Sequence, residues 1–171
     1  MQEAIDAISQ TLSRSDLTDR ERLEVIHGWA LVGLPRPRGG SWDDKKLWGA
    51  NTWLHYSPDL EICLAEAKRG GYSSMHRHAH KHNLFYLLSG KLLVKNHSLE
   101  AEHVLHPGNS ITIGANDWHR FISLDKSVIV ELYSKAGHAP VDLADIERQD
   151  VGGIAKDAAD LSKLGCQEEF A

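Results

Sequence analysis

Four histidines alternate with other residues along one short stretch of the chain. The stretch SSMHRHAHKHNLFYLLSG begins at residue 73, and its histidines are His76, His78, His80 and His82. Because successive side chains of a β-strand point to opposite faces, His76 and His78 project from the same face, about 7 Å apart along the strand. Imidazoles at that separation can converge on one ion, and neutral imidazole suits Zn, Fe, Mn, Ni or Cu. The row therefore predicts a site for a divalent transition metal, with a polar surface cluster as the alternative.

Two charged residues are candidates for catalytic roles beside such a site. Lys81 lies within the histidine row, where its ammonium group would neutralise a phosphate or an enediolate-like intermediate. A solvated lysine in a turn is the alternative. Glu131 interrupts the apolar segment SVIVELY and shares one strand face with Ile129 and Tyr133. If that face lines the interior, burial raises the pKa of Glu131 and suits it to be a general base; an outer-face glutamate is the alternative.

The elements that position these residues fall into three zones. Residues 1–40 form an N-terminal helical extension, in which apolar residues recur at helical spacing. Within this extension TDRE, residues 18–21, matches a capping box that opens a second helix. Residues 41–135 carry the β-strands, and residues 136–171 form a C-terminal tail. In the tail, DLADIERQD is either a short helix or irregular, and AKDAADLSKLG predicts a short helix that ends at Gly165.

The middle zone consists of short segments rich in β-branched and aromatic residues, separated by turn residues. These segments are NTWLHY, LEICLAEA, NLFYLLSGKLLV, SITI and SVIVELY. Within the third, LLSGKLLV predicts a hairpin that turns at Ser89 and Gly90. Many short strands without a long helix between them predict a mainly β protein, an antiparallel sandwich or barrel. Phe85 and Leu87 share the strand parity of Asn83, and Phe121 shares that of His119, so these three residues should line its interior.

Composition narrows the function classes. The chain has 171 residues and a formal net charge of −5, without a dense Lys/Arg block, so we expect one globular domain and no nucleic-acid partner. No apolar run reaches the roughly 20 residues that span a bilayer, and the N-terminus lacks the pattern of a signal peptide. Cys63 and Cys166 form neither a CxxC motif nor a disulfide framework. These features predict a cytoplasmic protein with reduced thiols and no membrane partner.

The β zone resembles the cupin superfamily, whose members are double-stranded β-helix (jelly-roll) barrels. The first cupin motif reads G-x5-H-x-H-x(3,4)-E-x6-G, and Asn83 stands at its glutamate. The residues that match this motif are Gly70, His76, His78 and Gly90. The second motif reads G-x5-P-x-G-x2-H-x3-N, and Gly108 and His119 match it. Asn116 stands at its second glycine, and both residue types tolerate a left-handed turn.

The resemblance implies a metal site formed by His76, His78 and His119, with Asn83 at the fourth position. An asparagine offers a neutral amide oxygen in place of a carboxylate, so the site loses one negative charge and binds metal less tightly. Three histidines leave coordination positions open for water, O2 or a bidentate substrate. The alternatives are that His80 or His82 completes the coordination, or that the site holds no metal.

The run HRHAHKHN is similar to the H-x-H-x-x-K-x-E run of cupin sugar isomerases, such as those of the mannose-6-phosphate isomerase and D-lyxose isomerase types. The resemblance implies a metal-dependent enzyme that acts on a small polar substrate, a sugar or sugar phosphate, with Lys81 and Glu131 as catalytic residues. A three-histidine iron dioxygenase and a non-catalytic small-molecule sensor are the alternatives. Cupins commonly dimerise, and the apolar faces of the N-terminal helices need a partner surface, so we expect a homodimer.

Overall fold

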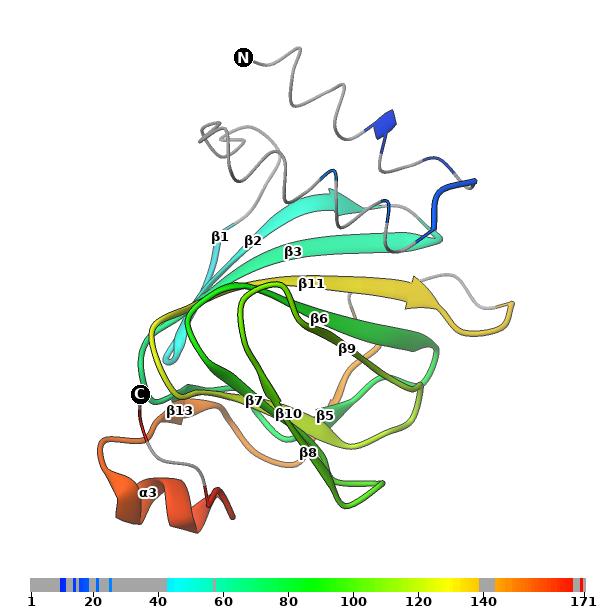
Figure 1. Ribbon diagram of the computed structural model, residues 1–171. Helices are drawn as coiled ribbons and strands as arrows, with labels where there is room; N and C mark the ends of the chain where they lie inside the picture. Colours follow the sequence, from blue (N-terminus) through cyan, green and yellow to red (C-terminus); the bar gives the residue numbers. More distant parts are fainter. Residues whose placement is uncertain are drawn as a thin grey trace.

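The computed structural model describes residues 43–56, 58–138, 144–167 and 170, together with eight residues nearer the N-terminus. Those eight are Gln10, Thr11, Arg14, Asp16, Leu17, Thr18, Glu21 and Val25. The described chain is mostly antiparallel β-structure, arranged as two sheets that face each other (Figure 1). The prediction of a mainly β, antiparallel jelly-roll fold is therefore confirmed. No helix among the described residues is long and apolar enough to cross a membrane.

The first sheet has the strand order β1-β2-β3-β11-β6-β9. Its strands are β1 (Asp43–Lys46), β2 (Gly49–Tyr56), β3 (Leu60–Ala67), β6 (Lys81–Ser89), β9 (Ser110–Ile113) and β11 (Ser127–Lys135). The second sheet has the order β12-β5-β10-β4-β13, and β7 pairs with β10 and β8. Its strands are β4 (Gly71–Tyr72), β5 (His76–Arg77), β7 (Leu92–Asn96), β8 (Ala101–Leu105), β10 (His119–Ser123), β12 (Glu147–Arg148) and β13 (Gly153–Ile154).

The predicted hairpin at Ser89 and Gly90 is wrong. β6 pairs with β11 and β9, whereas the following β7 pairs with β10 and β8, so the chain crosses from one sheet to the other at this point. Gly90 makes the crossing with φ +94, a conformation that other residues rarely adopt, and an added Cβ would lie 2.4 Å from the backbone oxygen of Lys126. A turn between two strands of one sheet and a crossing between sheets have the same local sequence signature.

Side-chain alternation divides the first sheet into an inner and an outer face. The inner face contributes Phe85, Leu87 and Ile129 to the central core, where they meet Phe121 of the second sheet. The residues of the opposite parity form a separate apolar cluster on the outer face: Leu60, Ile62, Leu64, Leu84, Val130 and Leu132. The prediction that Phe85, Leu87 and Phe121 line the interior is confirmed.

The N-terminal segment reaches this outer cluster at Val25, which packs against it. The predicted capping box is present: the Thr18 N–H and hydroxyl both donate to Glu21 Oε2 at 2.7 Å, and the Glu21 N–H donates to Thr18 Oγ1 at 3.3 Å. Gln10, Thr11, Glu21 and Val25 are helical, and most other residues of the predicted N-terminal helices lie outside the described residues.

The C-terminal segment adds two short strands to the second sheet. Within DLADIERQD, the residues Glu147 and Arg148 form β12 along β5, so a helix at this place is wrong. The predicted helix in AKDAADLSKLG is present as α3 (Ala158–Lys163), with Asp157 as its N-cap and Gly165 beyond its end at φ +67.

The homodimer remains a prediction. We expect sedimentation at micromolar concentration to show a species of twice the chain mass of 19.1 kDa, because the helices predicted from the sequence of residues 1–40 would carry apolar faces that need burial. A single species at the chain mass over the whole concentration range would contradict it.

Candidate metal centre

Three histidines from two neighbouring strands converge on the inner face of the second sheet. His76 on β5 lies opposite His119 on β10 in the strand register, and His78 directly follows β5. The nitrogen atoms that each ring offers lie within 4.8 Å of one another. The ring centroids are 4.4 Å apart for His76 and His119, 5.2 Å for His76 and His78, and 5.7 Å for His78 and His119. All three side chains are buried.

Backbone carbonyls fix the orientation of all three rings. The Nδ1 atoms lie 2.7 Å from the Ser74 oxygen for His76, 2.5 Å from the Asp145 oxygen for His78 and 2.8 Å from the Asp117 oxygen for His119. Because a carbonyl only accepts, each Nδ1 carries the proton and each Nε2 keeps a free lone pair. The Nε2 atoms of His78 and His119 are buried and have no hydrogen-bond partner among the residues that the structure describes. Such orphaned acceptors fit a metal ion, which would satisfy both of them.

Burial also keeps the three rings neutral. It lowers the pKa of His76 well below the ordinary value, that of His78 to about 3, and that of His119. Smaller contributions for His76 come from the neighbouring histidines and from the Arg148 guanidinium. At neutral pH no proton therefore needs to be displaced from the ring nitrogens before a metal binds.

Glu131 lies on the inner face of the first sheet, so the outer-face alternative is wrong. Its Oε2 accepts hydrogen bonds from the Tyr133 hydroxyl at 2.6 Å and from Asn83 Nδ2 at 3.2 Å. Burial raises the pKa of the Glu131 carboxyl, whereas both hydrogen bonds act in the opposite direction. The role of Glu131 as a general base remains a prediction. The burial and fixed orientation of its carboxylate support this prediction.

Asn83 is buried on β6, opposite Tyr133 on β11. Its amide nitrogen donates to Glu131, and its Oδ1 is buried with no hydrogen-bond partner in the described part of the chain. The Tyr133 ring in turn lies 5.3 Å from the His78 ring. The amide oxygen is thus a third orphaned acceptor in this part of the interior, and it remains the candidate for the fourth ligand.

Lys81 is buried, and its Nζ forms an ion pair with Glu61 Oε2 at 3.1 Å. The ammonium group also lies 5.0 Å from the centroid of the Tyr133 ring. The alternative of a solvated turn lysine is therefore wrong. The site residues predicted from the sequence do not include Glu61, although a glutamate that interrupts the apolar segment LEICLAEA carries the same signal as Glu131. Tyr133 is predicted on the same strand face as Glu131, without a role in the site.

His80 and His82 lie outside the cluster of three histidines. His80 is exposed in the bend after β5, and His82 is half-buried on β6. The bend reverses the parity of the row: His76 and His78 point inward at even positions, whereas Lys81 and Asn83 point inward at odd positions. The regular spacing of the four histidines thus does not correspond to one continuous strand.

A pocket of about 360 Å³ opens beside the histidines. Its inner wall includes His76, Glu131 and Tyr133, and its apolar wall includes Trp48 and Phe121. The rim comes from the β1–β2 hairpin and from the C-terminal segment around β12. A substrate in this pocket would therefore contact the carboxylate and one edge of the histidine cluster together.

Comparison with known proteins agrees with this arrangement. The sequence profile described as "Cupin domain" matches residues 63–134, which include His76, His78, Asn83, His119 and Glu131. Residues 63–134 are a cupin domain. No curated protein sequence matches the chain significantly.

Solved structures share the fold of this cupin at low sequence identity. An RmlC-like cupin from Shewanella frigidimarina is 16% identical over 60% of this chain and 90% of its own, with a TM-score of 0.51. KdgF from a Halomonas species is 21% identical over 56% of this chain and 87% of its own, with a TM-score of 0.51. Streptomyces Pac13, described as a nucleoside dehydratase, is 13% identical over 69% and 92%, with a TM-score of 0.56.

The cupin motif positions have clear structural counterparts. Asn116, at the second glycine of the second motif, adopts φ +66, and its N–H donates to the His78 backbone oxygen at 2.7 Å. Asparagine tolerates this left-handed conformation better than most residues. The substitution therefore keeps the turn that leads into β10 and His119.

The fourth position of the cupin site gives a direct test. We expect Asn83→Glu to raise metal affinity roughly tenfold or more, which corresponds to about 1.4 kcal/mol. The new carboxylate would lie beside Glu131, and a cation relieves the repulsion between two adjacent carboxylates. A competition titration with a chelator measures the change.

The matched control is Asn83→Leu, which has a similar size and no ligand atom, and it should bind metal more weakly than the wild type. Unchanged or weaker affinity in Asn83→Glu would mean that residue 83 points away from the ion.

Proposed function

We propose that this cupin is a metal-dependent enzyme that moves a proton on a small polar substrate, such as a sugar or sugar phosphate, in an isomerase- or epimerase-like reaction. The observation that carries the proposal is the position of a buried carboxylate, Glu131, in the same pocket as His76 of a three-histidine cluster. A three-histidine metal site alone could be structural or could store metal. A carboxylate beside it can also transfer protons to and from a substrate.

The donor set fits a divalent transition metal held by His76, His78 and His119, with the Asn83 amide oxygen as a fourth ligand. When bound, such a metal supplies Lewis acidity that polarises a carbonyl and orients two adjacent substrate oxygens. The protein contributes only neutral donors, so none of the positive charge is offset by a ligand carboxylate. A site with only neutral ligands binds the metal ion less tightly, but it leaves the ion better able to polarise a substrate carbonyl.

Glu131 would take the proton from a substrate carbon or hydroxyl and return it at the neighbouring position. Tyr133 and Asn83 hold Oε2 of this carboxylate by two hydrogen bonds, so its orientation is fixed before the substrate enters. Burial raises the pKa of Glu131, which makes it a stronger base than an exposed glutamate. Glu61 holds the Lys81 ammonium group by an ion pair, and this ammonium group lies over the Tyr133 ring.

The structural neighbours support the size and polarity of this substrate class. Pac13 has been solved with uridine, which carries a sugar ring. At the identities observed here the likeness extends to the fold alone, so it is consistent with this substrate class and transfers no chemistry to this chain. The chemistry of the proposal depends on the histidines and on Glu131.

A three-histidine iron dioxygenase is the second candidate. The observation that favours it is the donor set, because the cluster contains three histidines and no carboxylate. The same open coordination positions that accept a bidentate substrate also accept O2. The two candidates predict different co-substrates and different products.

Both candidates are tested with protein purified without a His-tag. We expect about one equivalent of a divalent transition metal by elemental analysis. We further expect metal-dependent exchange of a carbon-bound proton with D2O in a screen of sugars and sugar phosphates by NMR. Exchange that a chelator does not suppress would contradict the proposal. Substrate-dependent O2 uptake would instead establish the dioxygenase, and metal without either reaction would leave a binding protein.

A further inference from the structure

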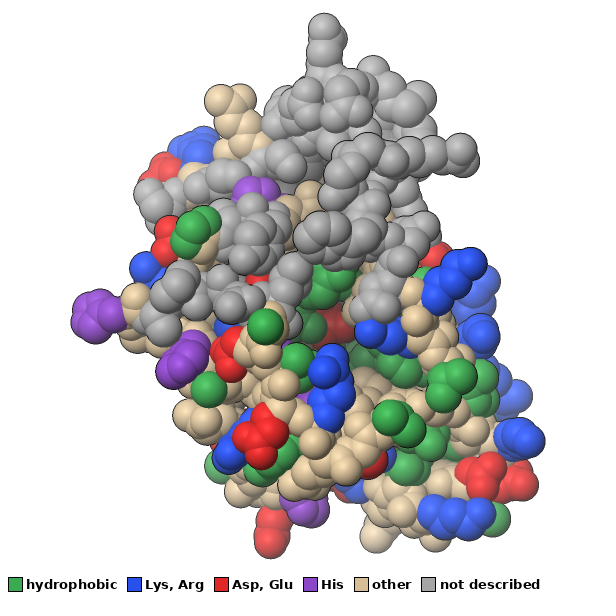
Figure 2. All heavy atoms as spheres, turned by 180° about the vertical axis from the view of Figure 1, so that it is seen from behind, with side chains coloured by type: hydrophobic (Ala, Val, Ile, Leu, Met, Phe, Trp, Pro, Cys, Tyr) green, Lys and Arg blue, Asp and Glu red, His purple; other side chains and the backbone are tan. Residues whose placement is uncertain are grey.

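Three cationic side chains stand at the mouth of the pocket. Lys45 and Lys46 come from β1, and Arg148 comes from β12. The chain as a whole carries a net charge of −5, and acidic and basic side chains share the face seen in Figure 2. The positive charge at the mouth is therefore a local concentration and does not reflect the overall composition.

The strand register directs Arg148 toward the histidines. Arg148 lies opposite His76 in the antiparallel pair of β12 and β5, and opposed residues of such a pair project from the same face. His76 faces the pocket, and Arg148 lines it as well. The neighbouring residue Glu147 lies opposite Arg77 and forms an ion pair with it at 2.7 Å. The two residues of β12 thus point in opposite directions. Glu147 forms the ion pair that holds β12 against β5, and Arg148 points toward the pocket.

Hydrogen bonds hold the segment that carries Arg148, residues 145–150, in place. The carboxylate of Asp145 accepts from the N–H groups of Ala79 at 2.9 Å and His80 at 2.8 Å. The Gln149 N–H donates to the Met75 oxygen at 2.9 Å, and the Met75 N–H donates to Asp150 at 2.8 Å. These contacts lie on both sides of Arg148, so its backbone position beside the metal centre is fixed.

Among the residues that the structure describes, neither Arg148 nor Lys45 forms an ion pair. The acid within the pocket, Glu131, is engaged by Tyr133 and Asn83. A guanidinium beside a site for a divalent cation is repelled by that cation unless an anion lies between them. The placement of Arg148 is thus favourable when the pocket holds a negatively charged molecule.

We infer that the substrate of this pocket is an anion, with a carboxylate or phosphate group bound by Arg148 and Lys45 while its polar carbon skeleton extends toward the histidines. The inference deepens the proposed function and rests on it, because it takes the pocket as the substrate site. A planar guanidinium binds the two oxygens of either group with paired hydrogen bonds, and Lys45 adds positive charge at the rim. Uncharged sugars lack this interaction.

The test compares three probes of similar size by isothermal calorimetry at millimolar concentration: D-glucuronate, D-glucose 6-phosphate and uncharged D-glucose. Each is measured with metal-loaded and with chelator-treated full-length protein. We expect at least one anion to bind roughly tenfold or more tightly than glucose. The carboxylate and phosphate arms distinguish the two sources of the charge. Arg148→Gln should remove most of the preference, and Arg148→Lys, which keeps the charge without the paired geometry, should retain part of it.

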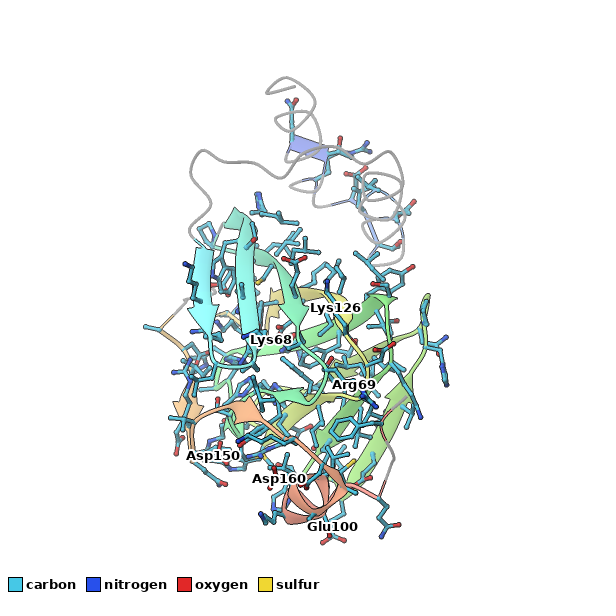
Figure 3. The ribbon with its side chains drawn as sticks, turned by 90° about the vertical axis from the view of Figure 1, so that its left-hand side faces the viewer. Lys68, Arg69, Glu100, Lys126, Asp150 and Asp160 are labelled. Atoms are coloured by element: carbon cyan, nitrogen blue, oxygen red, sulfur yellow. The ribbon has the colours of Figure 1, made fainter. Side chains whose placement is uncertain are left out.

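The matched control is Lys126→Gln, which removes one positive charge from an exposed residue outside the pocket. Figure 3 shows Lys126 well separated from Asp150, which lies at the end of the segment that carries Arg148. This variant should bind all three probes as the wild type does. Equal binding of charged and uncharged probes, no binding of either anion, or an unchanged preference in Arg148→Gln would each overturn the inference. Metal content, measured in parallel, reports separately on the proposed function and on the integrity of each variant.

Discussion

His119→Ala should contain no stoichiometric metal and should remain folded. His119 provides one of the three convergent nitrogens, and its Nε2 is buried with no hydrogen-bond partner among the described residues. Removing it leaves two imidazoles and a neutral amide oxygen, a weaker donor set than the three imidazoles or mixed His and carboxylate ligands of zinc sites. The structural cost is modest, because the variant leaves the Asp117 carbonyl without its hydrogen bond, at about 1–3 kcal/mol. The central core around Phe85 and Phe121 stays intact.

Elemental analysis and far-UV circular dichroism of the same preparation measure both parts of this expectation. His80→Ala is the matched control, because it removes the same side chain from an exposed position outside the cluster. It should keep its metal and its spectrum. Full metal content in His119→Ala would show that the ligand assignment is wrong, and equal loss in His80→Ala would extend the ligand set to the bend.

The inner-face residues could be predicted from sequence because strand parity is a local property. Once SVIVELY is taken as a strand, Glu131 must share a face with Ile129 and Tyr133, and the structure has them so. The pair of His76 and His78 follows from the same alternation. The arrival of His119 beside them depended on the resemblance to the cupin motifs, since nothing in the local sequence indicates that β10 lies next to β5.

Other parts of the site depend on contacts between distant segments. The ion pair of Lys81 and Glu61 joins residues on strands that are not neighbours in the sheet, so neither local sequence contains it. The segment around Arg148 pairs with β5 through a register of only two residues, too short to leave a periodic pattern. The simple alternation of side chains also breaks at the bend between His78 and Lys81. Before the bend the inward-facing residues have even numbers, and after it they have odd numbers.

Glu131→Gln should lower the rate of the proton-transfer reaction by about 10²–10⁴-fold, the usual contribution of a positioned general base. The amide keeps one oxygen where Oε2 accepts from Tyr133 and Asn83, so the fold and the metal content should be preserved. The rate of metal-dependent proton exchange with D2O, measured beside elemental analysis, separates loss of the base from loss of the site. Glu102→Gln, on β8 and outside the pocket, is the control that changes a glutamate without touching the site.

The pH profile provides a second check on the same residue. A base acts in its deprotonated form, and burial raises the pKa of Glu131, so activity should fall as pH decreases through a value above the ordinary range of glutamate. The hydrogen bond from Tyr133 stabilises the ionised carboxylate and lowers that pKa. Tyr133→Phe removes this bond and should move the acid limb of the profile to higher pH, while Glu131→Gln should lose the limb. An acid limb that stays in place in both variants would exclude Glu131 as the base and would assign the proton transfer to another group in the pocket.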